Sequence, residues 1–417
     1  MNRRKLLTTG KGLVLILSIF FFLFASYLPA EAQREKFIFG SAIAHTGKFA
    51  REGTNLKRAY DFWAGLVNAQ GGIEVKGKKY PVEIIYYDDK SDPATATKLM
   101  EKLISEDKVD LIFGPFSSDC VGPSSTITEK YKVPMIEAAG NAGTLFTRGF
   151  KYLFCTLRSA DDLADPYMRL LSRQSPKPKT VAVIAPKAPF YLSSAKGFKN
   201  YAAKYGFEVV HDETYPVEME DITPILQKVK AKSPDVLCVG SHTVVAMMIM
   251  KQSKEIDFNP KAYCFSFGTL TPEFAKELGK DAEYVLEYSY ISPKAPFKDP
   301  LLGTASQFIE DFKKKYGIYP DGTQVCGVAG GIAFQMAIQK AGLTPPLTEE
   351  KRVRAREELS KLDIITAAGP VKFDSTGLNV GNPLSVFQIQ KGKPVCVDPV
   401  DWVEANFIYP VPKWKDR

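Results

Sequence analysis

Short apolar runs and amphipathic stretches alternate along most of the chain. The apolar run at 37–44 is followed at 55–70 by apolar residues that recur with the 3.6-residue period of a helix. Further strand-like runs lie at 81–87, 110–113, 134–138, 180–185, 207–210, 236–240 and 262–267. Helix-like stretches stand between most of them. Strands that alternate with helices in this way predict parallel sheets flanked by helices.

The alternation falls into two series, one before and one after residue 157 or so. Three helix-like segments follow at 304–316, 325–341 and 349–362, and a tail of short strands and turns is expected at 369–397. No Gly/Ser-rich linker separates the two series. We therefore expect an α/β protein with two doubly wound, Rossmann-like lobes that ordered crossovers join.

The first 32 residues differ from the rest. Four basic residues within the first eleven precede a long apolar run at 13–28, and Ala30-Glu31-Ala32 follows. This order predicts a secretory signal peptide cleaved near Ala32, although an uncleaved anchor stays an alternative. The pair Arg3-Arg4 is compatible with twin-arginine export, but the very apolar core favours the general secretory route. Because no cysteine follows the cleavage site to carry a lipid, the sequence predicts a periplasmic location.

Charge and cysteine usage narrow the function classes further. Removal of the signal peptide lowers the net charge from +8 to about +5, and the remaining basic residues are mixed with acids, so no nucleic-acid partner is expected. The six cysteines are Cys120, Cys155, Cys238, Cys264, Cys326 and Cys396. None has C-x-x-C spacing, and three lie in strand-like runs. Buried free thiols are therefore expected for most of them.

Sequence motifs of the common enzyme classes are missing. The first strand leads into Gly40-Ser-Ala-Ile-Ala-His-Thr-Gly47, which does not fit the G-x-G-x-x-G of a dinucleotide site. No phosphate-binding P-loop, G-x-S-x-G elbow or H-E-x-x-H motif occurs, and there are only three histidines. The pair Asp88-Asp89 stands between a strand and a helix, where acids commonly cap turns. We expect no enzyme activity, no cofactor and no metal.

Candidate binding residues follow the predicted strands. The segment LIFGPFSSD ends a strand at Gly114 and presents two serines. Loops at the carboxyl ends of parallel strands are where α/β proteins bind ligands, and a cleft between two lobes is a favoured small-molecule site. The candidates in such loops are Phe49, Ser117, Ser118, Gly140 and Asn141 in the first lobe, and Tyr191 and His242 in the second.

These residues stand within motifs of a known family. The run NAQGGIEVKGKKYPVEIIYYDDKSDPATATKLMEKLISEDKVDLIFGPFSSD, followed by YKVPMIEAAGNAGTLFTRG, resembles the periplasmic substrate-binding proteins of ABC importers, in the branched-chain amino acid and amide class. The similarity continues in GFKNYAAKYGFEVV, FGTLTPEFAKELGKDAEYV and GPVKFDSTGLNVGNPLSVFQIQKGKPV. It covers nearly the whole chain after the signal peptide.

The resemblance implies a type I periplasmic-binding fold, like that of leucine-binding proteins, with three hinge crossovers near 157, 289 and 384. Residues 33–157 and 290–383 would form the first lobe, and 158–289 and 384–417 the second. In this family a serine after the G-P-x turn binds the ligand carboxylate, and Ser118 matches it. Ala139, Gly140 and Asn141 match a loop that adds contacts. Tyr191 matches a tyrosine that closes over the ligand.

Two departures from the family pattern bear on the ligand. Gly140 stands where Ser or Thr is common, so one hydroxyl is absent. The segment 265–269 has no acid to hold a ligand ammonium, and a buried ammonium without such a partner is costly. An α-amino acid is therefore less favoured unless Asp119, Asp161 or Asp162 takes that place. Aromatic or aliphatic carboxylates and amides are the alternatives.

The resulting prediction is a monomeric binding protein that closes around a small carboxylate-bearing ligand and delivers it to the permease subunits of an importer. One rival is the same fold acting as a sensor for a chemoreceptor or kinase. A second is an exported hydrolase that uses Ser117 or Ser118, but no motif supplies its base. A third, a structural or adhesive protein, would not need two lobes with a polar cleft.

Overall fold

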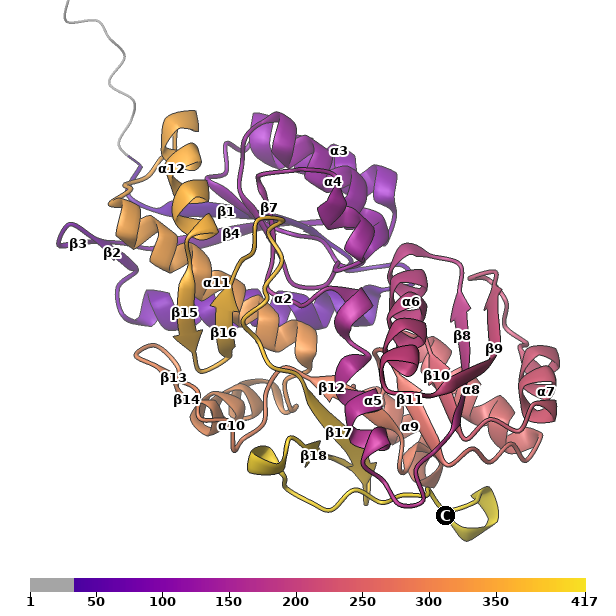
Figure 1. Ribbon diagram of the computed structural model, residues 1–417. Helices are drawn as coiled ribbons and strands as arrows, with labels where there is room; N and C mark the ends of the chain where they lie inside the picture. The colour runs from indigo at the N-terminus through magenta and orange to yellow at the C-terminus, as the bar shows by residue number, and fades with distance from the viewer. Residues whose placement is uncertain (1–33) are drawn as a thin grey trace, which may run out of the picture.

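The computed structural model describes residues 34–417, which form two lobes, each built on its own sheet (Figure 1). The predicted signal peptide lies outside the described residues. The helices are α2 (Ala50–Ala69), α3 (Pro93–Ser105), α4 (Ser118–Lys130), α5 (Asp165–Ser172), α6 (Pro189–Lys204), α7 (Thr223–Ala231), α8 (Thr243–Glu255), α9 (Pro272–Leu278), α10 (Ala305–Tyr316), α11 (Gly322–Ala341) and α12 (Glu349–Ser360). Short 3-10 turns include η1 (Gly143–Thr147) and η2 (Ala160–Asp162).

The first lobe contains a five-stranded parallel sheet in the order β4-β1-β5-β6-β7. Its strands are β1 (Phe37–Ile43), β4 (Val82–Asp88), β5 (Leu111–Phe113), β6 (Met135–Glu137) and β7 (Leu153–Cys155). The rings of Phe39, Trp63, Phe113 and Phe334 contact one another in the core of this lobe. The predicted doubly wound arrangement is therefore present here.

The second lobe contains a seven-stranded sheet in the order β18-β17-β12-β11-β10-β8-β9. Its strands are β8 (Thr180–Pro186), β9 (Glu208–Tyr215), β10 (Val236–Val239), β11 (Ala262–Phe265), β12 (Leu286–Ser289), β17 (Ser385–Gln390) and β18 (Lys393–Asp398). The five strands from β8 to β12 are parallel, and the tail adds β17 and β18 in antiparallel pairing. Three two-stranded ribbons complete the strands: β2 (Ile73–Val75) with β3 (Lys78–Tyr80), β13 (Lys298–Asp299) with β14 (Gly303–Thr304), and β15 (Asp363–Thr366) with β16 (Gly369–Lys372).

The chain returns to the first lobe through α11, which lies along α2 (Figure 1). Two glycines make this close approach possible. A Cβ atom at Gly331 would lie 2.3 Å from the ring of Trp63, and one at Gly327 would lie 2.8 Å from the Cβ of Ala59. Larger residues at these positions would push the two helices apart.

The observed elements differ from the sequence prediction in several places, and α5, α9 and β12 were not predicted. Helix α2 begins at Ala50, five residues before the predicted start, and β9 continues to Tyr215 instead of ending at 210. Helix α4 was not predicted. Its sequence SDCVGPSSTITEK is rich in small polar residues and contains Pro123, so it has no clear apolar face. Burial between neighbouring elements, rather than helix propensity, accounts for this helix.

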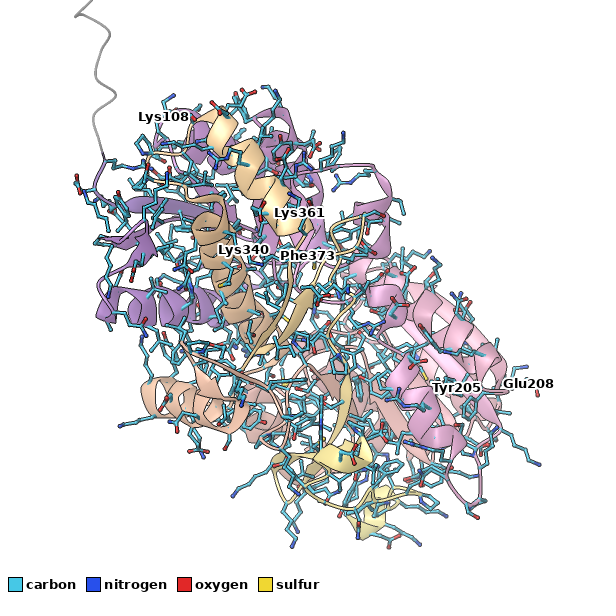
Figure 2. The ribbon with its side chains drawn as sticks, turned by 60° about the vertical axis from the view of Figure 1, so that its left-hand side comes forward. Lys108, Tyr205, Glu208, Lys340, Lys361 and Phe373 are labelled. Atoms are coloured by element: carbon cyan, nitrogen blue, oxygen red, sulfur yellow. The ribbon has the colours of Figure 1, made fainter. Side chains whose placement is uncertain are left out.

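Several chain-wide predictions can be checked directly. All six cysteines are free and buried, so the prediction of buried thiols is confirmed. Asp88 accepts hydrogen bonds from the backbone N–H groups of His45 and Lys90 and thus stabilises a turn, as expected. Lys108, Lys340 and Lys361 come from separate parts of the first lobe (Figure 2). Within residues 34–417, no helix has the length and apolar character needed to cross a membrane.

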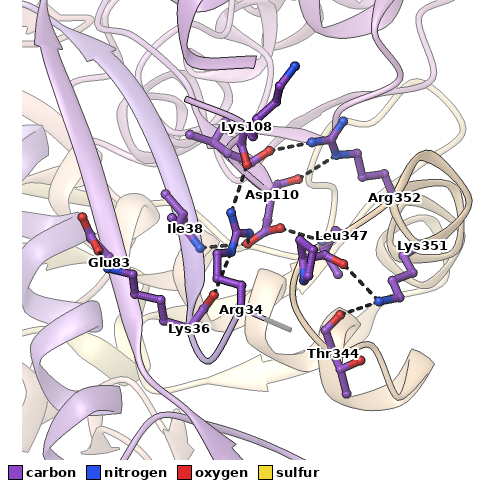
Figure 3. Close-up of polar contacts among 12 residues, drawn as sticks. Arg34, Lys36, Ile38, Glu83, Lys108, Asp110, Thr344, Leu347, Lys351 and Arg352 are labelled. Atoms are coloured by element: carbon purple, nitrogen blue, oxygen red, sulfur yellow. Dashed lines mark hydrogen bonds and ion pairs between the residues drawn. The ribbon is translucent and has the colours of Figure 1, made fainter. Parts of the chain in front are cut away.

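A buried acid fastens the later part of the chain to the first sheet (Figure 3). Asp110 precedes β5 and pairs with Arg34. Its carboxylate also accepts hydrogen bonds from the backbone N–H of Ile38 at 2.8 Å and of Leu347 at 2.6 Å. Arg352 of α12 donates to the carbonyl oxygens of Asp110 and Val109. This network lies at the amino-terminal end of β5.

Candidate functional site

The other end of β5 carries the predicted serine loop. Ser117 has a φ of +81°, a left-handed conformation that non-glycine residues rarely adopt. Its side chain is 2% exposed, and its Oγ has no hydrogen-bond partner among the described residues. The neighbouring Ser118 is the first residue of α4, and its Oγ accepts a hydrogen bond from the backbone N–H of Ala142 at 3.2 Å. A strained backbone and an unpaired buried hydroxyl are common at binding sites.

The next loop of the first lobe is held by an acid that the sequence analysis missed. Glu137 is the last residue of β6, and its Oε1 accepts hydrogen bonds from the N–H groups of Ala138 (2.9 Å), Ala139 (2.5 Å) and Gly140 (2.9 Å). Burial raises the pKa of Glu137 to about 8. The N–H groups of Ala139 and Gly140 are therefore engaged within the protein. The only sequence signal was a Glu inside an otherwise apolar run.

Two features fix the position of this loop. A Cβ atom at Gly140 would lie 2.4 Å from Cγ2 of Val121 and 3.3 Å from the carbonyl oxygen of Ser117. Val121 thus fills the space that a Ser or Thr side chain at position 140 would need. Asn141 donates from its amide to the carbonyl oxygen of Arg158 at 2.7 Å, which ties the loop to the crossover that follows β7.

The two lobes meet at a group of aromatic rings around His242. His242 lies at the amino-terminal end of α8, and Tyr191 is the third residue of α6. The rings that contact His242 are Phe49 at 5.4 Å and Phe116 at 5.6 Å from the first lobe, and Phe190 at 4.9 Å, Tyr191 at 5.0 Å and Phe267 at 5.6 Å from the second. All six side chains of this ring cluster are buried. The structure therefore brings Phe49, Tyr191 and His242 together, although the first and the last are 193 positions apart in the sequence.

The surroundings of His242 keep it neutral. Burial lowers the pKa of His242 to about 3, and the positive charge of Lys48 acts in the same direction. Its Nδ1 is buried without a hydrogen-bond partner among the described residues. A neutral imidazole donates at one nitrogen and accepts at the other. His242 can therefore make a specific hydrogen bond at the boundary between the lobes.

Two of the three acids named above as possible partners of a ligand ammonium group already have other contacts. Asp161 pairs with Lys196 and also accepts from Ser193, and Asp162 accepts from Tyr201 at 2.9 Å. In the second lobe, Glu287 accepts hydrogen bonds from the N–H of Leu270 and the hydroxyl of Thr269. Burial raises the pKa of Glu287 to about 7. Asp161 and Asp162 are thus engaged in structural contacts, whereas Asp119 is half-buried with Lys48 as its cationic neighbour.

Further contacts cross between the lobes beside the ring cluster. The backbone N–H of Gly143 in η1 donates to Oγ of Ser193 in α6 at 3.0 Å. Arg51 of α2 pairs with Glu277 of α9 at 3.5 Å. The described conformation is therefore one in which the lobes are in contact.

Comparison with known proteins decides the family. The family model described as "Periplasmic binding protein" matches residues 39–394. The chain belongs to this family. The curated relative "Leu/Ile/Val-binding protein homolog 8" of Brucella abortus (strain 2308) is 28% identical over 379 residues, which cover 87% of this chain and 90% of the relative. The family predicted from the sequence is confirmed.

Solved structures confirm the type I periplasmic-binding fold. The branched-chain amino acid transporter substrate-binding protein LivJ from Streptococcus pneumoniae, in complex with isoleucine, superposes with a TM-score of 0.74 at 21% identity, covering 90% of this chain and all of that one. A solute-binding protein of an ABC transporter from R. palustris, in complex with benzoate, has a TM-score of 0.74 at 18% identity and covers 89% of this chain and 98% of that one. At these identities the likeness establishes the fold.

Proposed function

We propose that this periplasmic binding protein captures a small carboxylate-bearing ligand between its lobes and delivers it to an ABC importer. One observation supports the site above all others. Two buried polar atoms that have no hydrogen-bond partner within residues 34–417, Oγ of Ser117 and Nδ1 of His242, lie in the loops where the lobes meet. Buried polar atoms are nearly always paired, and unpaired ones cost free energy. A ligand that pairs them would regain that free energy on binding.

The predicted site residues take distinct roles in this proposal. Ser118, at the amino-terminal end of α4, and Ser117 would bind the ligand carboxylate, because a helix amino terminus favours negative charge. The loop of Ala139, Gly140 and Asn141 would flank it from the same lobe. Phe49 would line the apolar part of the ligand.

Tyr191 and His242 would approach from the second lobe. Closure would bring them onto a ligand already held by the first lobe, and the contact between Phe49 and His242 across the lobes supports this movement. Such closure needs hinges. We propose hinges near 157, 289 and 384, with residues 33–157 and 290–383 in the first lobe and 158–289 and 384–417 in the second. The sheet membership of β7, β12 and β17 supports these boundaries.

In the proposed role, the protein binds and releases the ligand without changing it chemically. The protein would act as a monomer in the periplasm, after removal of the signal peptide, and the importer's permease subunits would recognise the closed form. Isoleucine and benzoate, the ligands of the two solved structures named above, share a carboxylate. That shared group is the part of the ligand that this proposal assigns to Ser117 and Ser118.

Calorimetric titration tests the site. A panel of amino acids and small aromatic and aliphatic carboxylates is titrated into the purified protein, and the tightest ligand is then titrated into Ser118→Ala. Loss of a hydrogen bond to a charged group costs about 1.5–3 kcal/mol, so the affinity should fall roughly 10- to 150-fold. Ser360→Ala, at an exposed helix end, is the control and should bind like the wild type. Unchanged affinity of Ser118→Ala would show that the carboxylate binds elsewhere.

A further inference from the structure

Glu52 is a buried acid at the boundary between the lobes that carries no ion pair. It lies in the first turn of α2, one turn after Phe49, and its side chain is 4% exposed. Among residues 34–417, no basic side chain comes within 4.0 Å of its carboxylate, because the neighbouring Arg51 reaches across to Glu277 instead. Buried carboxylates are usually paired, since an isolated buried charge is costly.

The surroundings of Glu52 place it beside the proposed ligand site. Burial raises the pKa of Glu52, and Thr243, which follows His242 in the second lobe, lies close enough to lower it in part, although its buried hydroxyl has no hydrogen-bond partner among the described residues. The negative charges of Asp119 and Glu52 both act on the phenol group of Tyr191. Glu52 is thus close to residues of both lobes that surround the ring cluster.

The other charged groups offset this carboxylate only in part: the charge of Arg51 lowers the pKa of Glu52, whereas the charge of Asp321 raises it. His242 is neutral, and the side chain of Lys48 is solvent-exposed and acts on Asp119. Glu137 and Glu287 already accept hydrogen bonds from their own loops. A ligand with only a carboxylate would bring another negative charge to a region where Glu52 and Asp119 already lie. A positive group on the ligand would offset one of these two negative charges.

We propose that Glu52 binds a protonated nitrogen of the ligand, so that the site selects molecules that carry a cationic nitrogen as well as a carboxylate. This inference rests on the proposed function and adds to it the residue that determines specificity. The aromatic faces of Phe49 and Tyr191 would add cation–π attraction to the same group. The acid would therefore come from α2 of the first lobe and not from the segment 265–269, where the family pattern places it.

Matched pairs of ligands test the proposal by calorimetric titration. Each pair differs in one amino group: L-leucine and 4-methylpentanoate, L-phenylalanine and 3-phenylpropanoate, and 4-(aminomethyl)benzoate and 4-methylbenzoate. In the wild type, the amine-bearing member of at least one pair should bind ten times more tightly or better. In Glu52→Gln that affinity should fall at least tenfold, while the affinity for the amine-free member stays the same or rises.

Three controls separate the possible outcomes. Glu83→Gln makes the same charge change at an exposed position of β4 and should leave every affinity unchanged. Thermal unfolding of Glu52→Gln without ligand should match or exceed that of the wild type, because a buried charge is removed. Glu52→Asp keeps the charge and should retain a preference for the amine.

Different experimental results would contradict the role of Glu52 and the proposed function. If the amine-free carboxylates bind as well as the amines and Glu52→Gln changes nothing, the role of Glu52 is wrong while the carboxylate site stands. If no member of any pair binds the wild type, both proposals are wrong.

Discussion

The two ends of β5 are built in opposite ways. At the amino-terminal end, Asp110 is buried but paired with Arg34 and with two backbone N–H groups. At the carboxyl end, Ser117 is buried and its hydroxyl has no partner among the described residues. Beyond Ser117, across the lobe boundary, Nδ1 of His242 is unpaired as well. Only three residues of strand separate these two environments.

This difference indicates which polar groups maintain the fold and which are available to a ligand. A network whose members satisfy one another rigidifies the lobe and has little left to offer another molecule. Unpaired buried groups lower stability, and they persist where another function requires them. The comparison predicts that substitutions at the amino-terminal end reduce stability, whereas substitutions at the carboxyl end change binding.

The largest effect is expected for Asp110→Ala. This change leaves Arg34 without its partner and removes the acceptor for the N–H groups of Ile38 and Leu347 (Figure 3). Removal of one partner from a buried pair costs about 3–5 kcal/mol. Urea unfolding of the ligand-free protein should show a loss of stability of that size. The ligand affinity of the molecules that remain folded should be normal.

The matched control for Asp110 is Glu83→Ala. Glu83 pairs with Lys36 on the same sheet, but both side chains are about half exposed (Figure 3). An exposed pair contributes about 0–1 kcal/mol, so this variant should unfold almost like the wild type. Equal losses from the two variants would contradict the structural role of Asp110.

The next largest effect concerns the pH dependence of stability, to which Glu137, the acid that holds the loop after β6, contributes. Because the pKa of Glu137 is about 8 in the folded protein, against an ordinary value near 4.5, the folded state holds a proton that the unfolded state has lost. Stability therefore falls as pH rises between these two values, by about 1.4 kcal/mol per pH unit at most. Glu287, with a pKa of about 7, acts in the same direction.

Glu137→Gln isolates the contribution of one acid. The Gln side chain keeps an oxygen for the three backbone N–H groups but cannot lose a proton. Between pH 5 and pH 8 the wild type should lose on the order of 2–4 kcal/mol relative to this variant, measured by chemical unfolding at each pH. Below pH 6.5 the neutral His242 destabilises both proteins alike and cancels in the difference. Parallel pH profiles would show that Glu137 does not titrate in this range.

The sequence predicted the parts of the fold that depend on local pattern. Buried strands such as β8 and β10 are short apolar runs that any parallel sheet needs, and the glycine at Gly206, with a φ of +75°, ends α6 within two residues of the predicted position. The candidates Phe49, Tyr191 and His242 could be found because loops after parallel strands converge on one edge. Their direct contact could not be foreseen, since it depends on how the lobes close.

There are physical reasons why Glu137, Glu52 and helix α4 could not be predicted from the sequence. Glu137 lies in an apolar run, where an acid gives no periodic signal, and only the structure shows that it holds its own loop. Glu52 is one of several charged residues near the start of an amphipathic helix, and such residues are usually solvent-exposed. It is buried at the boundary between the lobes, where Thr243 of the second lobe is its neighbour. Helix α4 lacked an apolar face and so gave no helical pattern.

A smaller effect is expected at the contact between Gly140 and Val121. In Gly140→Ser the new Cβ would lie 2.4 Å from Cγ2 of Val121, and overpacking of this kind costs about 1–3 kcal/mol. Adding Val121→Ala should recover most of that loss, because the two changes compensate in volume. Thermal unfolding of both single variants and of the double variant measures the coupling. Additive losses would show that the two residues do not share this space.

The smallest effect, and the one that best separates lobe closure from ligand contact, is expected for Ser193→Ala. Ser193 accepts from the N–H of Gly143 across the lobes, so its loss should weaken the closed form by about 0.5–1.5 kcal/mol and every ligand affinity by roughly 2- to 12-fold. Ser194→Ala is the control, because that hydroxyl bonds only within α6 to the carbonyl oxygen of Phe190.

A residue that acts through closure changes all affinities by one common factor, whereas a residue that touches the ligand changes them selectively. Calorimetric titration of two chemically different ligands should therefore give the same ratio in Ser193→Ala and different ratios in Glu52→Gln. A ligand-dependent ratio for Ser193→Ala would show that Ser193 contacts the ligand and does not act only through closure.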